Sequence, residues 1–353
     1  MLMSEESLAM REESLSTLRS LIKTIDGKKV TLIGDTMLDR FHHGFANNLN
    51  STAPVPVLKV TRTEESAGAS AHIAIGLCSF GMNVSFYTCV GDDSDGNSII
   101  QCLDEAGVNT GDIVIANKRS TLTKIRFFGS RESLLDRGQI LLQADRGPTD
   151  DLPKEISQRL TSNANKYLKD SCALIISDYD KGVVTFEGAQ SLIDSANESG
   201  IPSIVDPKLT GLEKSRGATV VIFERRGLSL LARRLNTKND EEAAKLLIDD
   251  YAWDGMLVLD GINGLYLYQK DNDTIHYPSM APAAEQQIGM HDAAAASLAA
   301  SLGSGLSLYD AALLAAASCE CVLSASTSKE YIDRTTLSLW LDELLWQMRI
   351  SER

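Results

Sequence analysis

Five short polar clusters in this sequence follow apolar stretches and carry residue types that can bind a ligand or move a proton. They combine aspartates with glycines, a tyrosine and a lysine, and they lie at 34–35 with Asp39, 91–93, 177–179, 206–208 and 289–292. Ligands of open parallel sheets bind at the carboxyl ends of the strands, so polar residues there are the first candidates for a site. Any one cluster is equally well explained as a helix cap or a turn, but five together are hard to attribute to packing.

The segments that must position these clusters alternate between apolar runs and helical periodicity. The apolar runs are 30–39, 84–93, 173–179, 201–207, 218–223 and 255–261. The helical segments between and after them are 68–81, 97–106, 186–199, 239–250, 292–302 and 308–323. This alternation predicts an α/β fold, with a mainly parallel central sheet covered by helices on both faces. Residues 53–60 and 121–145 alternate polar and apolar instead, which favours a small antiparallel lid.

Both ends of the chain show a helical apolar stripe. We therefore expect an N-terminal helical extension over 1–27, a body over 28–330 with lid strands near 41–62 and 121–145, and a C-terminal helix within 331–353. The stripe of the last helix contains leucines and Trp340, and it has two explanations. It packs on the body of the protein, or it forms a surface for a protein partner.

Composition excludes several classes of protein. Among the 353 residues, 34 Lys+Arg stand against 48 Asp+Glu, so the formal net charge is −14. Such a chain lacks the basic face of a nucleic-acid binder, although a local basic pocket for a small phosphorylated ligand remains compatible with it. No apolar run is long enough to span a membrane, and the acidic N-terminus lacks a signal-peptide core, so we expect a cytoplasmic protein. No cysteines and histidines stand at metal-ligand spacing, and no metal site is predicted.

Seven motifs keep a common order over residues 28–327. They are GDTMLDRF (34–41), APVPVLKV (53–60), VGDDSDG (90–96), TLTKIR (121–126), ISDYDKG (176–182), VDPK (205–208) and SRGATVV (215–221). In this set the chain resembles the PfkB/ribokinase family of sugar kinases, and within it the D-glycero-β-D-manno-heptose 7-phosphate kinases. The resemblance implies a ribokinase-like three-layer body with a β-lid that closes over the sugar. It also implies a homodimer formed through the lid strands.

The resemblance assigns catalytic and sugar-binding roles to individual positions. Asp292 corresponds to the catalytic base that takes the proton of the attacking hydroxyl, at the start of a helix over 292–302. The adjoining amides, from Gly289 onward, correspond to an anion hole for the transferred phosphoryl group. A simple N-cap is the alternative for Asp292. Asp39 corresponds to the acidic residue that hydrogen-bonds sugar hydroxyls, and Gly68 falls in the family's substrate turn.

Further positions correspond to the phosphate side of the substrate. Lys124 and Arg126 match a basic pair suited to a 7-phosphate, and a solvated lid face is the alternative. Five more residues match a block near the sugar and phosphates, namely Asp178, Tyr179, Lys181, Asp206 and Lys208. His72 stands beside the expected sugar site where the family has an asparagine. A lone histidine there is more often packed or hydrogen-bonded than a new base.

The sequence departs from the family pattern where the nucleotide should bind. The motif before the base is D-x-T-G-A-G-D in the family and runs from Gln286 to Asp292 here, with only Gly289 and Asp292 kept. Met290 and His291 replace small residues, which restricts the backbone and crowds the nucleotide phosphates. Ile288 removes a hydroxyl, and Gln286 removes a carboxylate that the family uses near a cation.

A second departure follows the strand at 218–223. The family's T-P-N-x-x-E has Glu224 in place of the asparagine and Gly227 in place of the glutamate, with Arg225 and Arg226 between them. Two arginines are poor neighbours for Mg²⁺, which prefers oxygen ligands and water. The degenerate nucleotide site thus retains Gly264 and Gly289 together with the altered Glu224 and Gly227, while Leu259 replaces a threonine.

These losses fall on the nucleotide side, whereas the sugar side is largely kept. Phosphoryl transfer depends on positioned phosphates and metal. We therefore hypothesise a sugar-kinase homologue that binds a sugar phosphate while phosphotransfer is lost or strongly reduced, with a binding or regulatory role. The alternative is an active heptose 7-phosphate 1-kinase, and only this alternative requires Mg·ATP.

Overall fold

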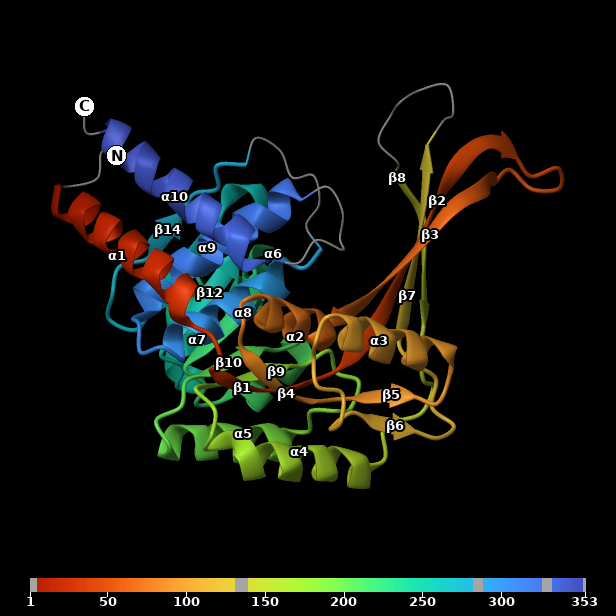
Figure 1. Ribbon diagram of the computed structural model, residues 1–353, viewed down its shortest axis with the longest axis horizontal. Helices are drawn as coiled ribbons and strands as arrows, with labels where there is room; N and C mark the ends of the chain where they lie inside the picture. Colours follow the sequence, from red (N-terminus) through yellow and green to blue (C-terminus); the bar gives the residue numbers. More distant parts are fainter. Residues whose placement is uncertain (1–4, 131–138, 282–287, 326–331, 352–353) are drawn as a thin grey trace.

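The computed structural model describes residues 5–130, 139–281, 288–325 and 332–351, which form an eight-stranded central sheet with helices on both faces (Figure 1). Six strands run parallel, in the order β4 (Asn83–Tyr87), β1 (Lys29–Gly34), β9 (Ala173–Ser177), β10 (Ser203–Asp206), β11 (Val220–Glu224) and β12 (Gly255–Leu259). Two antiparallel strands, β13 (Leu265–Gln269) and β14 (Ile275–Tyr277), complete one edge. A small parallel pair, β5 (Cys89–Gly91) and β6 (Val114–Ala116), lies outside this sheet. The predicted fold class is confirmed.

Side chains alternate across the central sheet and build two cores. On β9, Ala173 and Ile175 enter one core while Leu174 and Ile176 enter the other. The first core is covered by α1 (Glu5–Thr24), α2 (Ser70–Ser79), α3 (Ser94–Glu105), α8 (Met290–Leu302), α9 (Leu308–Ser324) and α10 (Arg334–Ser351). The second is covered by α4 (Lys154–Leu168), α5 (Phe186–Glu198), α6 (Arg225–Leu235) and α7 (Asp240–Tyr251). Short 3-10 helices, η1 (Leu209–Ser215) and η2 (Gly261–Asn263), follow β10 and β12.

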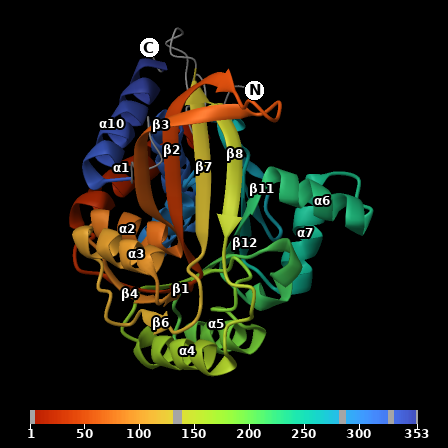
Figure 2. The same cartoon turned by 90° about the vertical axis from the view of Figure 1, so that its right-hand side faces the viewer.

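A four-stranded lid projects from the body (Figures 1 and 2). Its order is β3 (Pro56–Ala69), β2 (Thr36–Leu49), β7 (Thr123–Ser130) and β8 (Gln139–Arg146). The expectation of an antiparallel lid is wrong for the central pair, because β2 and β7 both leave the body in the same direction and run parallel. A parallel pair needs a long crossover connection, and the chain from α2 to β6 supplies it. The predicted strand 30–39 is divided at Asp35, so Asp39 belongs to the lid.

The two terminal helices pack against each other on the body (Figure 1). Leu15 and Leu18 of α1 share a core with Leu337 and Leu341 of α10, and Arg19 forms a 2.5 Å ion pair with Asp342. The inner side of the C-terminal stripe is therefore covered by the chain itself. No helix among the described residues is long and apolar enough to cross a membrane.

Candidate functional site

A cavity of about 470 Å³ opens between the lid strand β7 and the carboxyl ends of β10 and β11. Its polar lining comes from the lid, from the loops after β9 and β10, and from the start of α8. These residues are Lys124, Arg126, Tyr179, Asp206, Lys208, Glu224, His291 and Asp292. The structure thus brings together most of the polar clusters that the sequence singled out. The cluster at 91–93 is an exception, because Asp93 caps α3 by accepting a hydrogen bond from the amide of Gly96.

Asp39 and Arg126 form a buried ion pair at the lid end of this cavity. Arg126 Nη1 lies 2.6 Å from Asp39 Oδ1, and about a tenth of each side chain is exposed. Burial raises the pKa of Asp39, and the guanidinium of Arg126 opposes this rise. Gly68 is required beside them, because a Cβ on that residue would lie 2.0 Å from Asp39 Oδ2. The pair holds a carboxylate and a cation together on adjacent lid strands.

The first turn of α8 carries Asp292 and lies against His72 of α2. The helix begins at Met290, two residues before the expected start, and Gly289 precedes it with a φ of 94°. Asp292 Oδ2 lies 3.1 Å from His72 Nδ1. Among the described residues Asp292 Oδ1 is buried without a hydrogen-bond partner, and Asp292 lines the cavity. This oxygen can accept a hydrogen bond from a ligand hydroxyl, and the N-cap position of the helix is occupied by Gly289 instead of Asp292.

His291 lies between two carboxylates at the far side of the cavity. Its Nδ1 is 3.1 Å from Asp206 Oδ1, and its Nε2 is 3.7 Å from Glu224 Oε1. Burial disfavours the imidazolium, but the charges of Asp206, Glu224 and Asp292 outweigh burial and raise the pKa of His291. The surrounding carboxylates therefore favour the protonated form of His291.

This raised pKa predicts how stability changes with pH. A histidine whose pKa is higher in the folded than in the unfolded state stabilises the folded protein when it is protonated. This stabilisation is complete below the unfolded pKa of about 6.5 and is lost as the pH rises through the folded pKa. We expect the free energy of unfolding of the wild type, relative to His291→Gln, to fall as the pH rises above about 6.5 and through the folded pKa. Urea denaturation of both proteins across this range measures the difference. A constant difference would contradict the pairing.

A second cavity, of about 320 Å³, lies on the other side of His291. It is lined by Arg225, Arg226, Leu259, Asp260, Gly261 and Ile262, and it shares Glu224, Met290 and His291 with the first cavity. These three shared residues form the boundary between the two cavities. Gly264 turns the chain from η2 into β13 with a φ of 92° and lines neither cavity.

The second cavity is lined by both arginines and carboxylates. Arg225 is already engaged, with its Nε 2.6 Å from Asp240 and its guanidinium 5.0 Å from the ring centre of Tyr266. Within the described part of the chain, no group of three or more His, Cys, Asp or Glu residues is arranged to hold a metal ion.

A third cavity, of about 420 Å³, continues from the first along the lid. Lys124 and Lys208 line both of these cavities, and Lys181 and Arg146 line the third. Lys208 Nζ is held 4.1 Å from the ring centre of Tyr179. Three lysines and an arginine around one hollow are the residues that a phosphate group requires.

Two buried aspartates fix the loop that carries Tyr179 and Lys181. Asp35 accepts hydrogen bonds from the backbone amides of Tyr179, Lys181 and Val183, at 2.9, 3.0 and 3.2 Å. Asp178 lies 2.8 Å from Lys214 Nζ, is almost fully buried and lines none of the three cavities. Asp35 belongs to the first polar cluster that the sequence singled out but had no individual role there, and Lys214 was not singled out. The position of Asp35 directly after a strand was the available signal.

The fold, the lid and the polar cavity define a protein of the ribokinase-like class. Phosphofructokinase-2 from Escherichia coli superposes with a TM-score of 0.70 at 16% identity, covering 90% of this chain and 99% of that one. Ribokinase from Arabidopsis thaliana, solved with ribose and ATP, superposes with a TM-score of 0.68 at 15% identity, covering 89% and 99%. Identities this low establish the fold alone. The pfkB family carbohydrate kinase model matches residues 28–333, and the chain belongs to that family.

The chain is also similar in sequence to bifunctional proteins named HldE. The bifunctional protein HldE of Paramagnetospirillum magneticum is 32% identical over 334 residues, which are 94% of this chain and 67% of the relative. HldE of Salmonella dublin is 31% identical over 287 residues, which are 81% of this chain and 58% of the relative. The chain thus spans about three fifths to two thirds of the length of these relatives.

Proposed function

We propose that this protein binds a phosphorylated sugar of the heptose 7-phosphate type and that transfer of phosphate from ATP is lost or strongly reduced. The observation that carries the proposal is the position of His291. Its side chain, held by Asp206 and Glu224, occupies the boundary between the sugar-side cavity and the cavity beyond it. A transferred phosphoryl group has to pass this boundary, and kinases of this family use Mg·ATP.

The sugar side supports the binding half of the proposal. Asp39 and the partnerless oxygen of Asp292 are acceptors for sugar hydroxyls. Lys124 and Lys208, at the junction of two cavities, supply charge for the phosphate of the same ligand. A neutral sugar would leave these cations unused.

Calorimetry tests both the binding of the sugar phosphate and the interaction with Mg·ATP. The full chain is titrated with D-glycero-D-manno-heptose 7-phosphate, with Mg·ATP, and with Mg·ATP after saturation by the sugar phosphate. We expect binding of the sugar phosphate alone and no heat from Mg·ATP in either titration. Lys124→Ala should weaken the sugar phosphate about tenfold, because a charge-assisted hydrogen bond contributes about 1.5–3 kcal/mol. Lys59→Ala is the matched control, since Lys59 is an exposed lysine of the lid strand β3.

The active kinase remains the competing function, and Asp292 favours it. This aspartate begins a helix beside a cavity and keeps one oxygen available to a hydroxyl. Robust release of ADP that depends on the sugar phosphate, and that Asp292→Asn abolishes, would establish the kinase and refute the loss of phosphotransfer. Failure of the sugar phosphate to bind at all would refute both.

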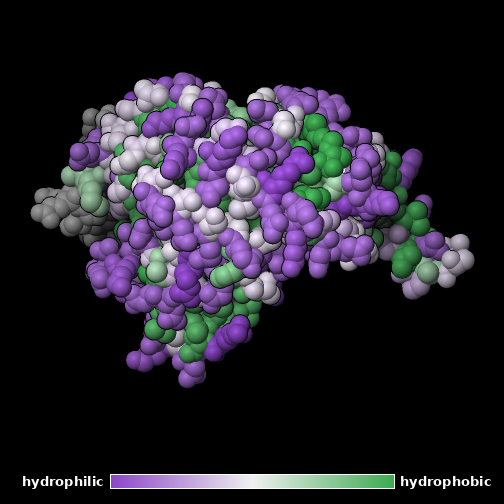
Figure 3. All heavy atoms as spheres, turned by 90° about the horizontal axis from the view of Figure 1, so that it is seen from below, coloured by the Kyte–Doolittle hydropathy of each residue, from purple (hydrophilic) through white to green (hydrophobic). Residues whose placement is uncertain are grey.

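The expected homodimer through the lid stays a prediction, as do a protein partner and a cytoplasmic location. Exposed aliphatic side chains on and around the lid strands favour the dimer, and Figure 3 shows hydrophobic atoms on the lid that protrudes at the right. These residues are Leu49, Val55, Val57, Val60, Ile140, Leu141 and Leu142.

A further inference from the structure

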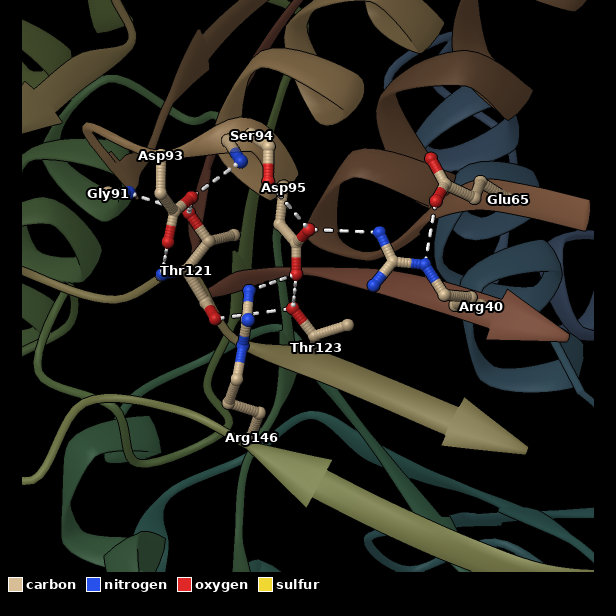
Figure 4. Close-up of polar contacts among 10 residues, drawn as sticks. Arg40, Glu65, Gly91, Asp93, Ser94, Asp95, Thr121, Thr123 and Arg146 are labelled. Atoms are coloured by element: carbon tan, nitrogen blue, oxygen red, sulfur yellow. Dashed lines mark hydrogen bonds and ion pairs between the residues drawn. The ribbon is translucent and has the colours of Figure 1, made fainter. Parts of the chain in front are cut away.

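Asp95, in the first turn of α3, is the joint at which the lid meets the body (Figure 4). Its Oδ1 accepts a hydrogen bond from Arg40 Nη2 of β2 at 2.9 Å. Its Oδ2 accepts a hydrogen bond from Thr123 Oγ1 of β7 at 2.6 Å and also contacts the guanidinium of Arg146, at the end of β8. Arg40 in turn pairs with Glu65 of β3 at 2.7 Å. Three lid strands thus contact one carboxylate that is 2% exposed, and the fourth strand is linked to it through Arg40.

The neighbouring Asp93 strengthens the same joint (Figure 4). It accepts hydrogen bonds from the amide and the hydroxyl of Thr121, at 2.9 and 2.6 Å, where the chain enters β7. Few apolar contacts compete with these polar ones at the far edge of the lid, since every residue of β8 is exposed. The orientation of the lid therefore depends on charged contacts near its base.

Strand geometry couples this joint to the ligand site. Side chains of a strand alternate between its two faces. Asp39 and Lys124 are register partners on the cavity face, and the next residues along their strands, Arg40 and Thr123, reach Asp95 on the opposite face. A change in the joint therefore moves the cavity-facing residues with it.

We propose that Asp95 is a positioning residue, which holds the lid at the orientation in which Lys124 and Arg126 meet the phosphate of the ligand. The inference rests on the proposed sugar-phosphate site. Asp95 is not itself among the lining residues of the three cavities, although its partners Thr123 and Arg146 line the third. Its effect is therefore expected on the part of the affinity that the lid residues supply. Contacts made by the body alone should be retained when the joint is loosened.

The test compares Asp95→Asn with the wild type, using heptose 7-phosphate and the same heptose without phosphate. We expect about tenfold weaker binding of the phosphorylated sugar, because the loss of one charge leaves both guanidinium groups without their common anion. The unphosphorylated sugar should weaken clearly less, since it loses only the lid contact of Asp39 and keeps that of Asp292 on the body. Amide hydrogen exchange of β2, β7 and β8, measured without ligand, should be faster in the variant while the central strands keep their protection.

Two further variants separate positioning from general destabilisation. Arg40→Gln removes the guanidinium partner of Asp95 that lines none of the three cavities, and it should reproduce the selective loss of affinity for the phosphorylated sugar. Glu64→Gln makes the same type of change within the lid, where Glu64 pairs with His43 and Arg62, and should leave both affinities unchanged. Equal weakening of both sugars, or unchanged exchange in the lid strands, would overturn the proposal. If the wild type binds neither sugar, the proposed function fails, and the exchange data still decide whether Asp95 holds the lid.

Discussion

Replacing Arg126 with leucine is expected to destabilise the protein by about 3–5 kcal/mol and to abolish binding of the sugar phosphate. Only 9% of the Asp39 side chain is exposed, so the leucine leaves Asp39 as a buried carboxylate without its counter-charge. Burial already raises the pKa of Asp39, and removal of the arginine takes away the largest contribution that opposes this rise. Urea denaturation at neutral pH measures the loss of stability, and calorimetry measures the loss of affinity.

A double variant distinguishes the two consequences. Asp39→Asn combined with Arg126→Leu removes both charges, so most of the lost stability should return, because a buried ion pair is often replaceable by neutral side chains. Affinity for the sugar phosphate should stay low, because a hydroxyl acceptor and a phosphate cation are both missing. A single variant that loses less than about 1 kcal/mol would show that the pair is hydrated and worth little.

Changing Gly289 to alanine is expected to cost about 2 kcal/mol or more, because the backbone and the neighbouring ring both oppose a side chain. The φ of 94° belongs to a region that other residues rarely adopt. The new Cβ would also lie 2.8 Å from His72 Cε1. His72 would have to move away from Asp292, which breaks the 3.1 Å contact between them.

The matched control for this change is Gly227→Ala. Gly227 lines the same cavity, but a Cβ there meets its nearest atom at an ordinary 3.5 Å, and the residue lies in the first turn of α6. Alanine is the better helix former, so stability should be unchanged or slightly higher. Combining His72→Ala with Gly289→Ala should restore the stability lost through the clash with the histidine ring. The stability lost through the unfavourable backbone conformation should not return. Equal effects at Gly227 and Gly289 in denaturant melts would contradict the role of the left-handed turn.

Much of the fold could be predicted because its determinants are local. Apolar runs and helical spacing indicated the six parallel strands of the central sheet, most of the helices on its faces and both terminal helices, but not α4 or β14. Helix α6 was not predicted, although Leu228, Leu231 and Ala232 are buried at helical spacing after the two arginines. The parallel pairing of β2 with β7 also escaped prediction, because it depends on where two distant segments leave the body.

The candidate site could be predicted as a set of positions but not as a set of contacts. Strand ends and motif spacing indicated Asp39, Lys124, Arg126 and Asp292, and these residues do lie around one cavity or pair with its lining. The pairing of His291 with Asp206 joins residues 85 positions apart, and no local pattern encodes it. The sequence showed only that a histidine had replaced a glycine, which suggested crowding. The structure adds that this histidine is held by carboxylates.

The packing of α1 against α10 has a consequence for the order of events during synthesis. The two helices share a core and an ion pair, yet roughly 300 residues separate them along the chain. At about 5–20 residues per second, α1 leaves the ribosome tens of seconds before its partner exists. Leu15, Leu18 and Ile22 of α1 are fully buried in the finished protein. Throughout that interval this apolar stripe lacks its final cover, so α1 is the segment of the nascent chain on which a chaperone is expected to act.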